Sequence, residues 1–272
     1  MARPVRAGQP PGGAVSGGRK AADFDQIGDG YSRIRCADPR LTAAIGQAIG
    51  PAASIVNIGA GTGSYEPAAA QVVAAEPSAV MLDQHPGSRR VRAGAESLPF
   101  GTGMFDASMA TLTVHHWSDP RDGLEEMKRV SRRQVVFTWD PDCRQELWLH
   151  SEYLPEMGDF ERTRFPFLDL VVDLLGAHQV VPFLIPFDFT DGFQHAFWRR
   201  PEVFLDPRVR AASSLFAVWP DDLVQPAVER LAADLASGRW ESRHGDLLVT
   251  DAVDYGYRIV VAGENLGQDV SS

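Results

Sequence analysis

The sequence predicts an α/β fold with a mostly parallel sheet, on two observations. A short apolar run at 54–58 leads directly into a glycine-rich turn, which is typical of a buried strand that ends at a ligand-binding loop. Further apolar runs then alternate with stretches of helical spacing as far as residue 139. This alternation indicates a doubly wound sheet, in which crossover helices join parallel strands.

The elements follow one another from residue 22. Apolar residues at helical spacing over 22–50, closed by Gly50-Pro51, predict a helix before the first strand. The strands predicted after it are 54–58, 72–75, 90–93, 105–110 and 134–139.

The pattern changes after Asp140-Pro141. Two helices are predicted over 143–178, and the apolar run 180–185 predicts a sixth strand whose proline favours an edge or irregular position. Residues 190–245 indicate mostly helix and loop, and a last strand is predicted at 257–262.

The turn Gly59-Ala60-Gly61-Thr62-Gly63 is the most informative local motif. Glu76 ends the next strand, where a carboxylate can accept hydrogen bonds from the two hydroxyls of an adenosine ribose. The third glycine of the dinucleotide fingerprint G-x-G-x-x-G is absent, because Ser64 follows Gly63. A nicotinamide or flavin enzyme is therefore disfavoured.

Four ordered segments between residues 54 and 139 carry a resemblance to a known family. They are the glycine turn with Glu76, the loop 94–100, the strand with its exit over 103–120, and the helix at 123–130. On these segments the sequence resembles the class I S-adenosylmethionine-dependent methyltransferases of the small-molecule, type 11-like kind. The resemblance implies a Rossmann-like, seven-stranded, mostly parallel sheet with an antiparallel closing strand and a helical lid or insertion.

The same resemblance implies how the chain is organised. Residues 1–20, rich in glycine, proline and arginine, are expected to be a disordered tail. The S-adenosylmethionine-binding core is expected over 21–142, and a largely helical substrate lid over 143–245 with one core strand near 180–186. Residues 246–272 are expected to supply the final strand and a C-terminal tail.

Composition narrows the possible partners. The net charge of −10 argues against nucleic acid as a partner, because phosphate binding favours a basic surface. The two cysteines, Cys36 and Cys143, lie far apart and indicate neither a disulfide framework nor a metal site. No apolar stretch is long enough for a membrane span. We therefore expect a cytoplasmic protein that acts on a small-molecule acceptor and has no membrane partner. A homodimer is a possible assembly.

The resemblance assigns S-adenosylmethionine, with S-adenosylhomocysteine as product, to the turn, the strand ends and an N-terminal segment. Arg35 is expected to reach the methionine carboxylate. Two positions depart from the family, since Asn57 and Gly94 stand where relatives usually carry aspartate. The predicted cofactor-binding residues are Tyr31, Arg35, Asn57, Gly59, Ala60, Gly61, Gly63, Glu76, Pro77, Met81, Ala95, Glu96, Thr111, Leu112 and Thr113.

His115 and His116 are the catalytic candidates. An imidazole, with an ordinary pKa near 6.5, suits removal of a proton from the acceptor. Adjacent residues leaving a strand are expected to point in opposite directions, so only one ring, preferably that of His116, should face the site. A histidine that only satisfies a loop carbonyl remains an alternative.

The predicted activity is an SN2 transfer of the sulfonium methyl group to an O, N or C atom of an apolar or aromatic small molecule, the chemistry of the EC 2.1.1 enzymes. The many aromatic residues after position 147 favour such an acceptor. The alternative is a non-catalytic, methyltransferase-like cofactor-binding or partner protein, which Asn57 and Gly94 keep open.

Overall fold

The sheet has the predicted topology. The structure, a computed structural model, describes residues 34–143, 146–164 and 168–266, so the predicted tail at 1–20 and Tyr31 lie outside the described residues. Seven strands of this part of the chain form one sheet in the order β3-β2-β1-β4-β5-β9-β6. The first five run parallel, whereas β9 is antiparallel to both of its neighbours. The mostly parallel sheet with an antiparallel closing strand is confirmed.

Most strands lie where the sequence predicts them. The predicted strand at 90–93 is reduced to two residues, and the one at 134–139 begins earlier because Val130, the last helical residue, leads directly into it. The strands of this sheet are β1 Ser54–Ile58, β2 Gln71–Ala75, β3 Arg90–Val91, β4 Phe105–Thr111, β5 Ser131–Trp139, β6 Gln179–Pro182 and β9 Tyr257–Gly263.

The single strand predicted at 180–185 is wrong in its extent. β6 ends at Pro182, and β7 (Ile185–Pro186) pairs with β8 (Ala252–Val253) in a separate two-stranded sheet. Proline has no backbone N–H to continue a ladder, so the apolar run divides there. β6 nevertheless occupies a sheet edge, as its proline predicted.

Local signals fix the helices of the sheet region. Asp38 caps α3 (Pro39–Ile49) by accepting from the Arg40 amide at 2.9 Å, and Gly50, at φ +74°, ends it. Asp119 caps the next long helix in the same way, through the amides of Arg121 and Asp122. The remaining helices here are α4 Ala79–Gln84, α5 Pro120–Val130 and α7 Leu168–Leu175.

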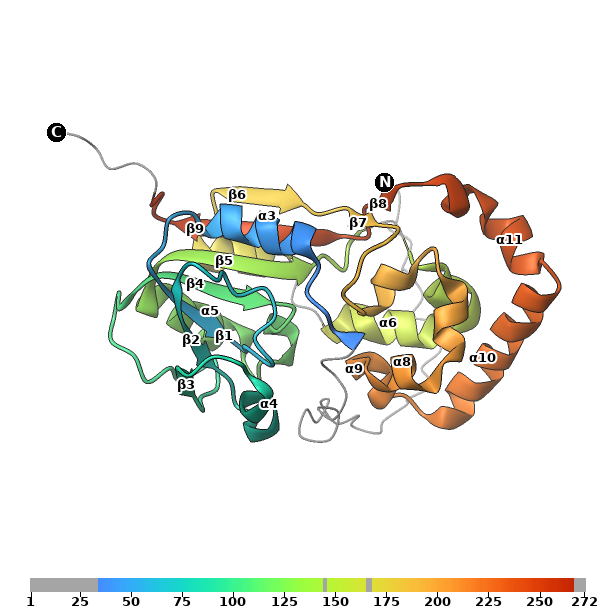
Figure 1. Cartoon of the computed structure of the whole chain (residues 1–272), viewed down its shortest axis with the longest axis horizontal. Helices are drawn as coiled ribbons and strands as arrows, with labels where there is room; N and C mark the ends of the chain where they lie inside the picture. Colours follow the sequence, from blue (N-terminus) through green and yellow to red (C-terminus); the bar gives the residue numbers. More distant parts are fainter. Residues whose placement is uncertain (1–33, 144–145, 165–167, 267–272) are drawn as a thin grey trace, which may run out of the picture.

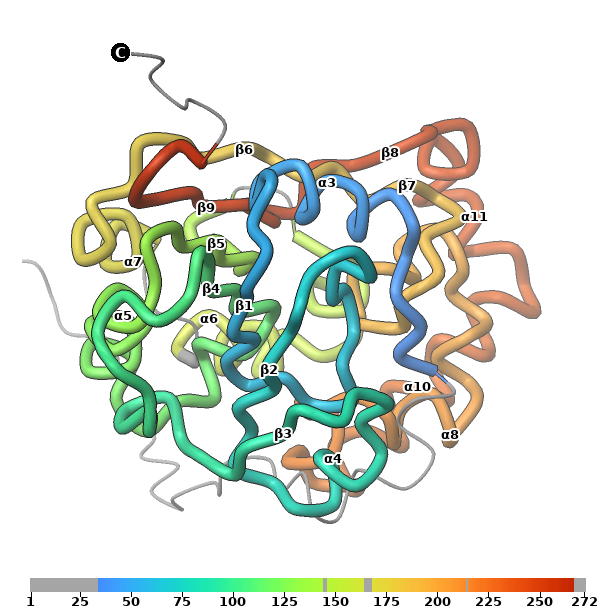
Figure 2. The backbone as a smooth tube through the Cα atoms, turned by 60° about the vertical axis from the view of Figure 1, so that its left-hand side comes forward, coloured from blue at the N-terminus to red at the C-terminus, as the bar shows by residue number. Residues whose placement is uncertain are grey.

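The two faces of the sheet are covered by different helices. Val135 and Phe137 of β5 are buried with the apolar residues of α3, whereas Val136 is buried with those of α5 and α7. Figure 2 shows α3 across the sheet from α5 and α7. Because side chains alternate along a strand, β5 buries side chains on both faces of the sheet and lies at the centre of the core.

The remaining helices gather at one end of the sheet. In Figure 1 the arrows of β4 and β5 point toward this group, which includes α6 and α8 to α11. Its aromatic side chains, such as Trp198 and Phe204, are buried in the same apolar cluster as α3 and one sheet face. No helix within the described ranges is long and apolar enough to cross a membrane. The elements outside the sheet region are a π-helical turn η2 Leu149–Tyr153, α6 Pro155–Arg164, η3 Gln194–Phe197, η4 Pro201–Leu205, α8 Pro207–Ala211, α9 Ser214–Ala217, α10 Asp221–Ala236, α11 Arg239–His244 and η5 Gly245–Val249.

Candidate functional site

A cavity of about 620 Å³ lies at the carboxyl ends of the parallel strands. This is the edge at which open α/β sheets bind ligands, and the volume falls in the range of small-molecule sites. One wall is formed by the ends of β1, β2 and β4. The other wall is formed by Tyr257 of β9 and by residues of the inserted region, which is the name used here for the described residues between 143 and 245 that lie outside α7 and β6. A ligand in this cavity would therefore contact both regions of the molecule.

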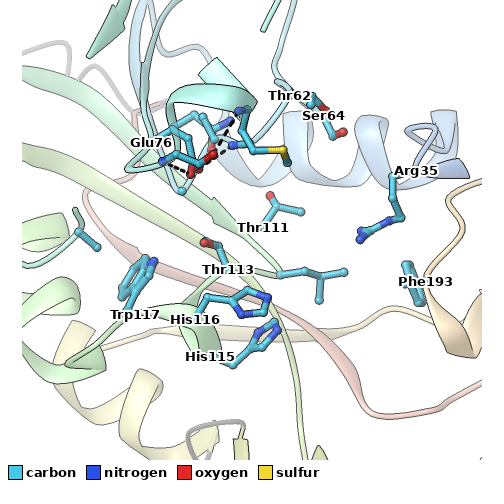
Figure 3. Close-up of a pocket in the computed structure, with 18 of the residues that line it drawn as sticks. Arg35, Thr62, Ser64, Glu76, Thr111, Thr113, His115, His116, Trp117 and Phe193 are labelled. Carbon is cyan, nitrogen blue, oxygen red and sulfur yellow. Dashed lines mark hydrogen bonds between the residues drawn. The ribbon is translucent and has the colours of Figure 1, made fainter. Parts of the chain in front are cut away.

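The glycine turn and Glu76 form one hydrogen-bonded unit. The Gly61 amide donates to Oε2 of Glu76 at 2.9 Å, and the Ser78 amide donates to Oε1 at 2.9 Å. Figure 3 shows the Glu76 carboxylate at the cavity wall with these bonds dashed. Glu76 therefore positions the turn and also faces the cavity.

Two glycines of the turn differ in what they face. Gly59 has φ +68°, and a Cβ there would lie 2.0 Å from Oγ1 of Thr113. Gly63 has φ +86°, and a Cβ there would lie 2.8 Å from Nε2 of His85. Gly63 is absent from the cavity lining, so its position is explained by close packing on His85.

Asn57 belongs to a buried polar network behind the turn. Its Nδ2 donates to Oε1 of Glu66 at 2.9 Å, and the same oxygen lies 3.0 Å from Nε2 of His85. The Glu66 carboxylate therefore lies directly beside Asn57. Nothing in the local sequence pattern distinguishes Glu66 from an ordinary exposed acid.

The Glu96 side chain is held by hydrogen bonds and lies close to Gly94. Oε1 of Glu96 accepts from the Ser118 amide and hydroxyl, both at 2.7 Å, and from the Asp119 amide at 3.2 Å. Burial works against the charged form, but these hydrogen bonds outweigh it and lower the pKa of Glu96. A Cβ at Gly94 would lie only 2.9 Å from Oε2 of Glu96. The Glu96 carboxylate thus occupies space that a side chain at position 94 would need.

Arg35 lies at the cavity but is already held by the inserted region. Its Nε and Nη2 donate to the two carboxylate oxygens of Asp191, at 2.6 and 3.1 Å. The Tyr65 hydroxyl also donates to Asp191, at 2.6 Å. Burial, followed by the Asp191 charge, raises the pKa of Tyr65. Figure 3 shows Arg35 beside Phe193, on the wall opposite Thr113.

The expectation that only one of the two histidines faces the site is wrong. Both His115 and His116 line the cavity, and their ring centroids are 3.8 Å apart. The chain leaves β4 through a 3₁₀ turn at Val114–His116, in which successive side chains are about 120° apart instead of on opposite faces.

Polar side chains of the inserted region complete the cavity, and local sequence patterns did not indicate them. Glu161, Gln194 and His195 line this wall, with the Tyr257 hydroxyl 3.1 Å from Nδ1 of His195. Burial holds the pKa of His195 well below its usual range. Burial also raises the pKa of Tyr257.

Most predicted residues that the structure describes do line the cavity. The residues found there are Arg35, Asn57, Gly59, Ala60, Gly61, Glu76, Pro77, Met81, Ala95, Glu96, Thr111, Leu112, Thr113, His115 and His116. The lining residues that were not predicted fall into two groups. Some, such as Thr62, Ser64 and Ser118, adjoin the recognised motifs and could have been included with them. The others come from the inserted region and β9 and carry no local signal.

Comparisons with known proteins agree with this geometry. A family model described as a methyltransferase domain matches residues 56–138. A crystal structure from Anabaena variabilis ATCC 29413, assigned to a methyltransferase of an antibiotic biosynthesis pathway, is 34% identical with a TM-score of 0.79, and the match covers 86% of this chain and 100% of that one. A demethylmenaquinone methyltransferase of Clavibacter sepedonicus is 33% identical over 133 residues, which are 42% of this chain. The match spans 54% of that relative's length.

Proposed function

This chain belongs to the class I S-adenosylmethionine-dependent methyltransferases, and we propose that it methylates a small aromatic or otherwise apolar molecule. The observation that carries the proposal is the shared cavity. One wall is the family's glycine turn with Glu76, and the other is made of large side chains from the inserted region. A cofactor on the first wall would present its sulfonium methyl group to an acceptor on the second.

The cofactor wall supports specific contacts. Glu76 accepts from the ribose hydroxyls, and the backbone around Ala60 and Gly61 approaches the methionine end. The Oε2 atom of Glu96 replaces the family's usual aspartate as acceptor for the adenine amino group, since it occupies the space beside Gly94. Arg35 contacts the methionine carboxylate while Asp191 holds its guanidinium.

The acceptor wall supports the chemical class of substrate. Phe193, Leu215 and Tyr257 provide apolar surface, and Gln194 and His195 provide a few polar groups that orient a ligand. The Clavibacter relative is named for demethylmenaquinone, which agrees with an acceptor of this class. We assign the role of substrate lid to residues 143–245.

Alignment of the acceptor with the methyl group provides most of the catalysis, because the sulfonium is already activated. Where the acceptor must lose a proton, His116 is the proposed base. His116→Ala is then expected to lower turnover by about 10²–10⁴-fold with little change in cofactor affinity. The same measurement on His115→Ala, whose ring lies in the same cavity, shows which of the two imidazoles acts as the base. Near-normal turnover of His116→Ala with the true acceptor would reject the base.

The test of the function starts with the cofactor. Glu76→Ala is expected to weaken S-adenosylhomocysteine binding by about 1.5–3 kcal/mol in calorimetry, because hydrogen bonds to a charged group are lost. Gly61→Val should weaken it as well by filling cavity space. The control is Glu125→Ala, which changes an exposed acid on α5. Unchanged affinity in both folded variants would overturn the assignment.

Turnover is tested with acceptors of the proposed class. Incubation with S-adenosylmethionine and a set of hydroxylated aromatic or quinol compounds should release S-adenosylhomocysteine with one of them. Binding of cofactor with no release for any compound, at any pH between 6 and 9, would count against this acceptor class.

A further inference from the structure

The strongest additional feature is a cluster of His150, Glu161 and His195 in the acceptor wall. One nitrogen of each imidazole and one carboxylate oxygen all lie within 4.8 Å of one another. Both histidines are buried, and Glu161 and His195 reach the cavity. Two imidazoles and one carboxylate are the protein ligands of many catalytic zinc sites. We propose that this cluster binds one divalent transition-metal ion, with zinc as the best match.

The hydrogen bonds around His150 show which of its nitrogens faces the cluster. The Gln194 amide nitrogen donates to Oγ of Ser213 at 3.2 Å, which turns the amide oxygen toward Nε2 of His150, at 2.9 Å. Nε2 of His150 therefore carries a proton, which leaves Nδ1 as the nitrogen that faces Glu161. Nδ1 then presents a lone pair to Oε2 of Glu161 at 3.5 Å. Two electron-rich atoms at this distance favour a cation between them.

His195 shows the same arrangement. Its Nδ1 lies 3.1 Å from the Tyr257 hydroxyl, so Nε2 is the nitrogen left to coordinate an ion. In metal sites the second nitrogen of a ligating histidine is usually fixed by such a partner, which sets the tautomer. Gln194 and Tyr257 would play that part here for the two imidazoles.

The distances suit a small ion after modest side-chain movement. Tetrahedral zinc with ligands at about 2.1 Å places those ligands about 3.4 Å apart. The His150–Glu161 separation of 3.5 Å is already close to this value. The other separations between ligand atoms, each at most 4.8 Å, must shorten by rotation of the Glu161 and His195 side chains.

The backbone brings these residues together in an unusual way. His150 lies in the π-helical turn Leu149–Tyr153, a rare conformation that is frequent at functional sites. Gly158 lets α6 approach this turn, since a Cβ there would lie 2.7 Å from Cβ of His150. Glu161, one turn further along α6, is thereby brought beside the histidine.

The cavity suggests what the ion does, and this step rests on the proposed function. Three protein ligands leave a position open toward the cavity, where an oxygen of the acceptor can bind. Coordination lowers the pKa of a bound hydroxyl. Its proton passes to the base, the oxygen forms the new C–O bond, and the C–S electron pair stays on sulfur. The inferred acceptor is therefore an oxygen nucleophile such as a phenol or an enol.

Metal content tests the site independently of turnover. The tag-free full chain is dialysed against Zn²⁺, and the bound metal is measured by elemental mass spectrometry. We expect about one ion per chain in the wild type and at least tenfold weaker binding in Glu161→Gln and His150→Gln. His178→Gln, which changes an exposed histidine before β6, should bind like the wild type. Co²⁺ in place of Zn²⁺ should give the visible absorption of a tetrahedral site, which both cluster variants lose.

The outcomes separate this inference from the methyltransferase assignment. S-adenosylhomocysteine calorimetry of each variant reports that it is folded. A wild type that binds S-adenosylhomocysteine but no Zn²⁺ would overturn the inference about the metal site and leave the methyltransferase assignment in place. Equal Zn²⁺ binding by the wild type and both cluster variants would also overturn it. Zn²⁺ binding without S-adenosylhomocysteine binding would leave the metal site standing and reject the proposed function.

Discussion

The two walls of the cavity are built in different ways. The sheet wall is built from the loops at the strand ends, where the glycine turn presents backbone groups beside the Glu76 carboxylate. The inserted wall uses large or polar side chains, such as Glu161, Phe193 and His195, from separate elements. A backbone-based site depends on a short local pattern and suits an invariant cofactor. A side-chain site depends on packing and suits an acceptor that differs between enzymes.

The largest expected effect tests whether the two regions form one folding unit. The Trp198 indole is fully buried and donates from Nε1 to the Ile185 carbonyl at 3.1 Å, and the backbone carbonyl of Trp198 accepts from Nε1 of Trp148 at 2.7 Å. Trp198→Ala should lower the free energy of unfolding by about 3–5 kcal/mol, because it leaves a large cavity. Urea unfolding followed by circular dichroism should remain one transition, since both regions share an apolar cluster.

The control for this prediction is Val249→Ala, which changes a side chain that is 82% exposed and should cost under about 0.5 kcal/mol. A separate early transition in Trp198→Ala, confined to the inserted helices, would instead show that the two regions are independently stable.

A smaller effect is expected at the backbone-based wall. Gly59→Ala combines a positive φ with a Cβ only 2.0 Å from Oγ1 of Thr113. It should cost about 2–3 kcal/mol of stability and reduce S-adenosylhomocysteine affinity at least tenfold. Gly101→Ala is the matched control, because nothing lies within 4 Å of its added Cβ. Similar affinities for the two variants would contradict the dependence of cofactor binding on this turn.

A pH effect of similar or smaller size should appear where the two regions meet. Asp38, at the start of α3, also accepts from the Thr190 amide at 3.1 Å. Burial opposes its charged form, but hydrogen bonds from Arg40 and Thr190 lower the pKa of Asp38 to about 2, from an ordinary 3.8. Because the folded pKa is lowered, this stabilisation is complete above about pH 4 and is lost as the pH falls toward 2.

The stabilisation by the Asp38 charge should be about 2 kcal/mol, which follows from the shift in its pKa. Urea unfolding between pH 5 and 2 should show that the wild type loses this much more stability than Asp38→Asn. Parallel pH profiles for the two proteins would mean that Asp38 contributes nothing through its charge.

The smallest expected effect concerns the link across the cavity. Tyr65→Phe removes the 2.6 Å hydrogen bond to Asp191 but leaves the Arg35–Asp191 pair in place. The cost should be about 1–2 kcal/mol in unfolding experiments. A double-mutant cycle with Arg35→Gln should reveal coupling between the two contacts, because both act on one carboxylate. Additive costs would show that Tyr65 and Arg35 act independently.

The sheet, the glycine turn and the position of Glu76 could be predicted from the amino-acid sequence. These features depend on interactions between near neighbours, such as apolar period, helix caps and the conformational freedom of Gly59, and such interactions leave a readable spacing. The site residues next to these motifs were predictable for the same reason.

Other features of the site depend on how distant parts of the chain pack together. The 3₁₀ turn after β4 directed both His115 and His116 into the cavity, and Pro182 divided an apolar run between two sheets. The cluster of His150, Glu161 and His195 draws on three separate helical elements with no common spacing in the sequence. Packing of α6 against the π-helical turn, together with the approach of η3, brings these side chains to one place. Contacts between residues far apart in the chain follow from packing of the whole fold, which no local pattern encodes.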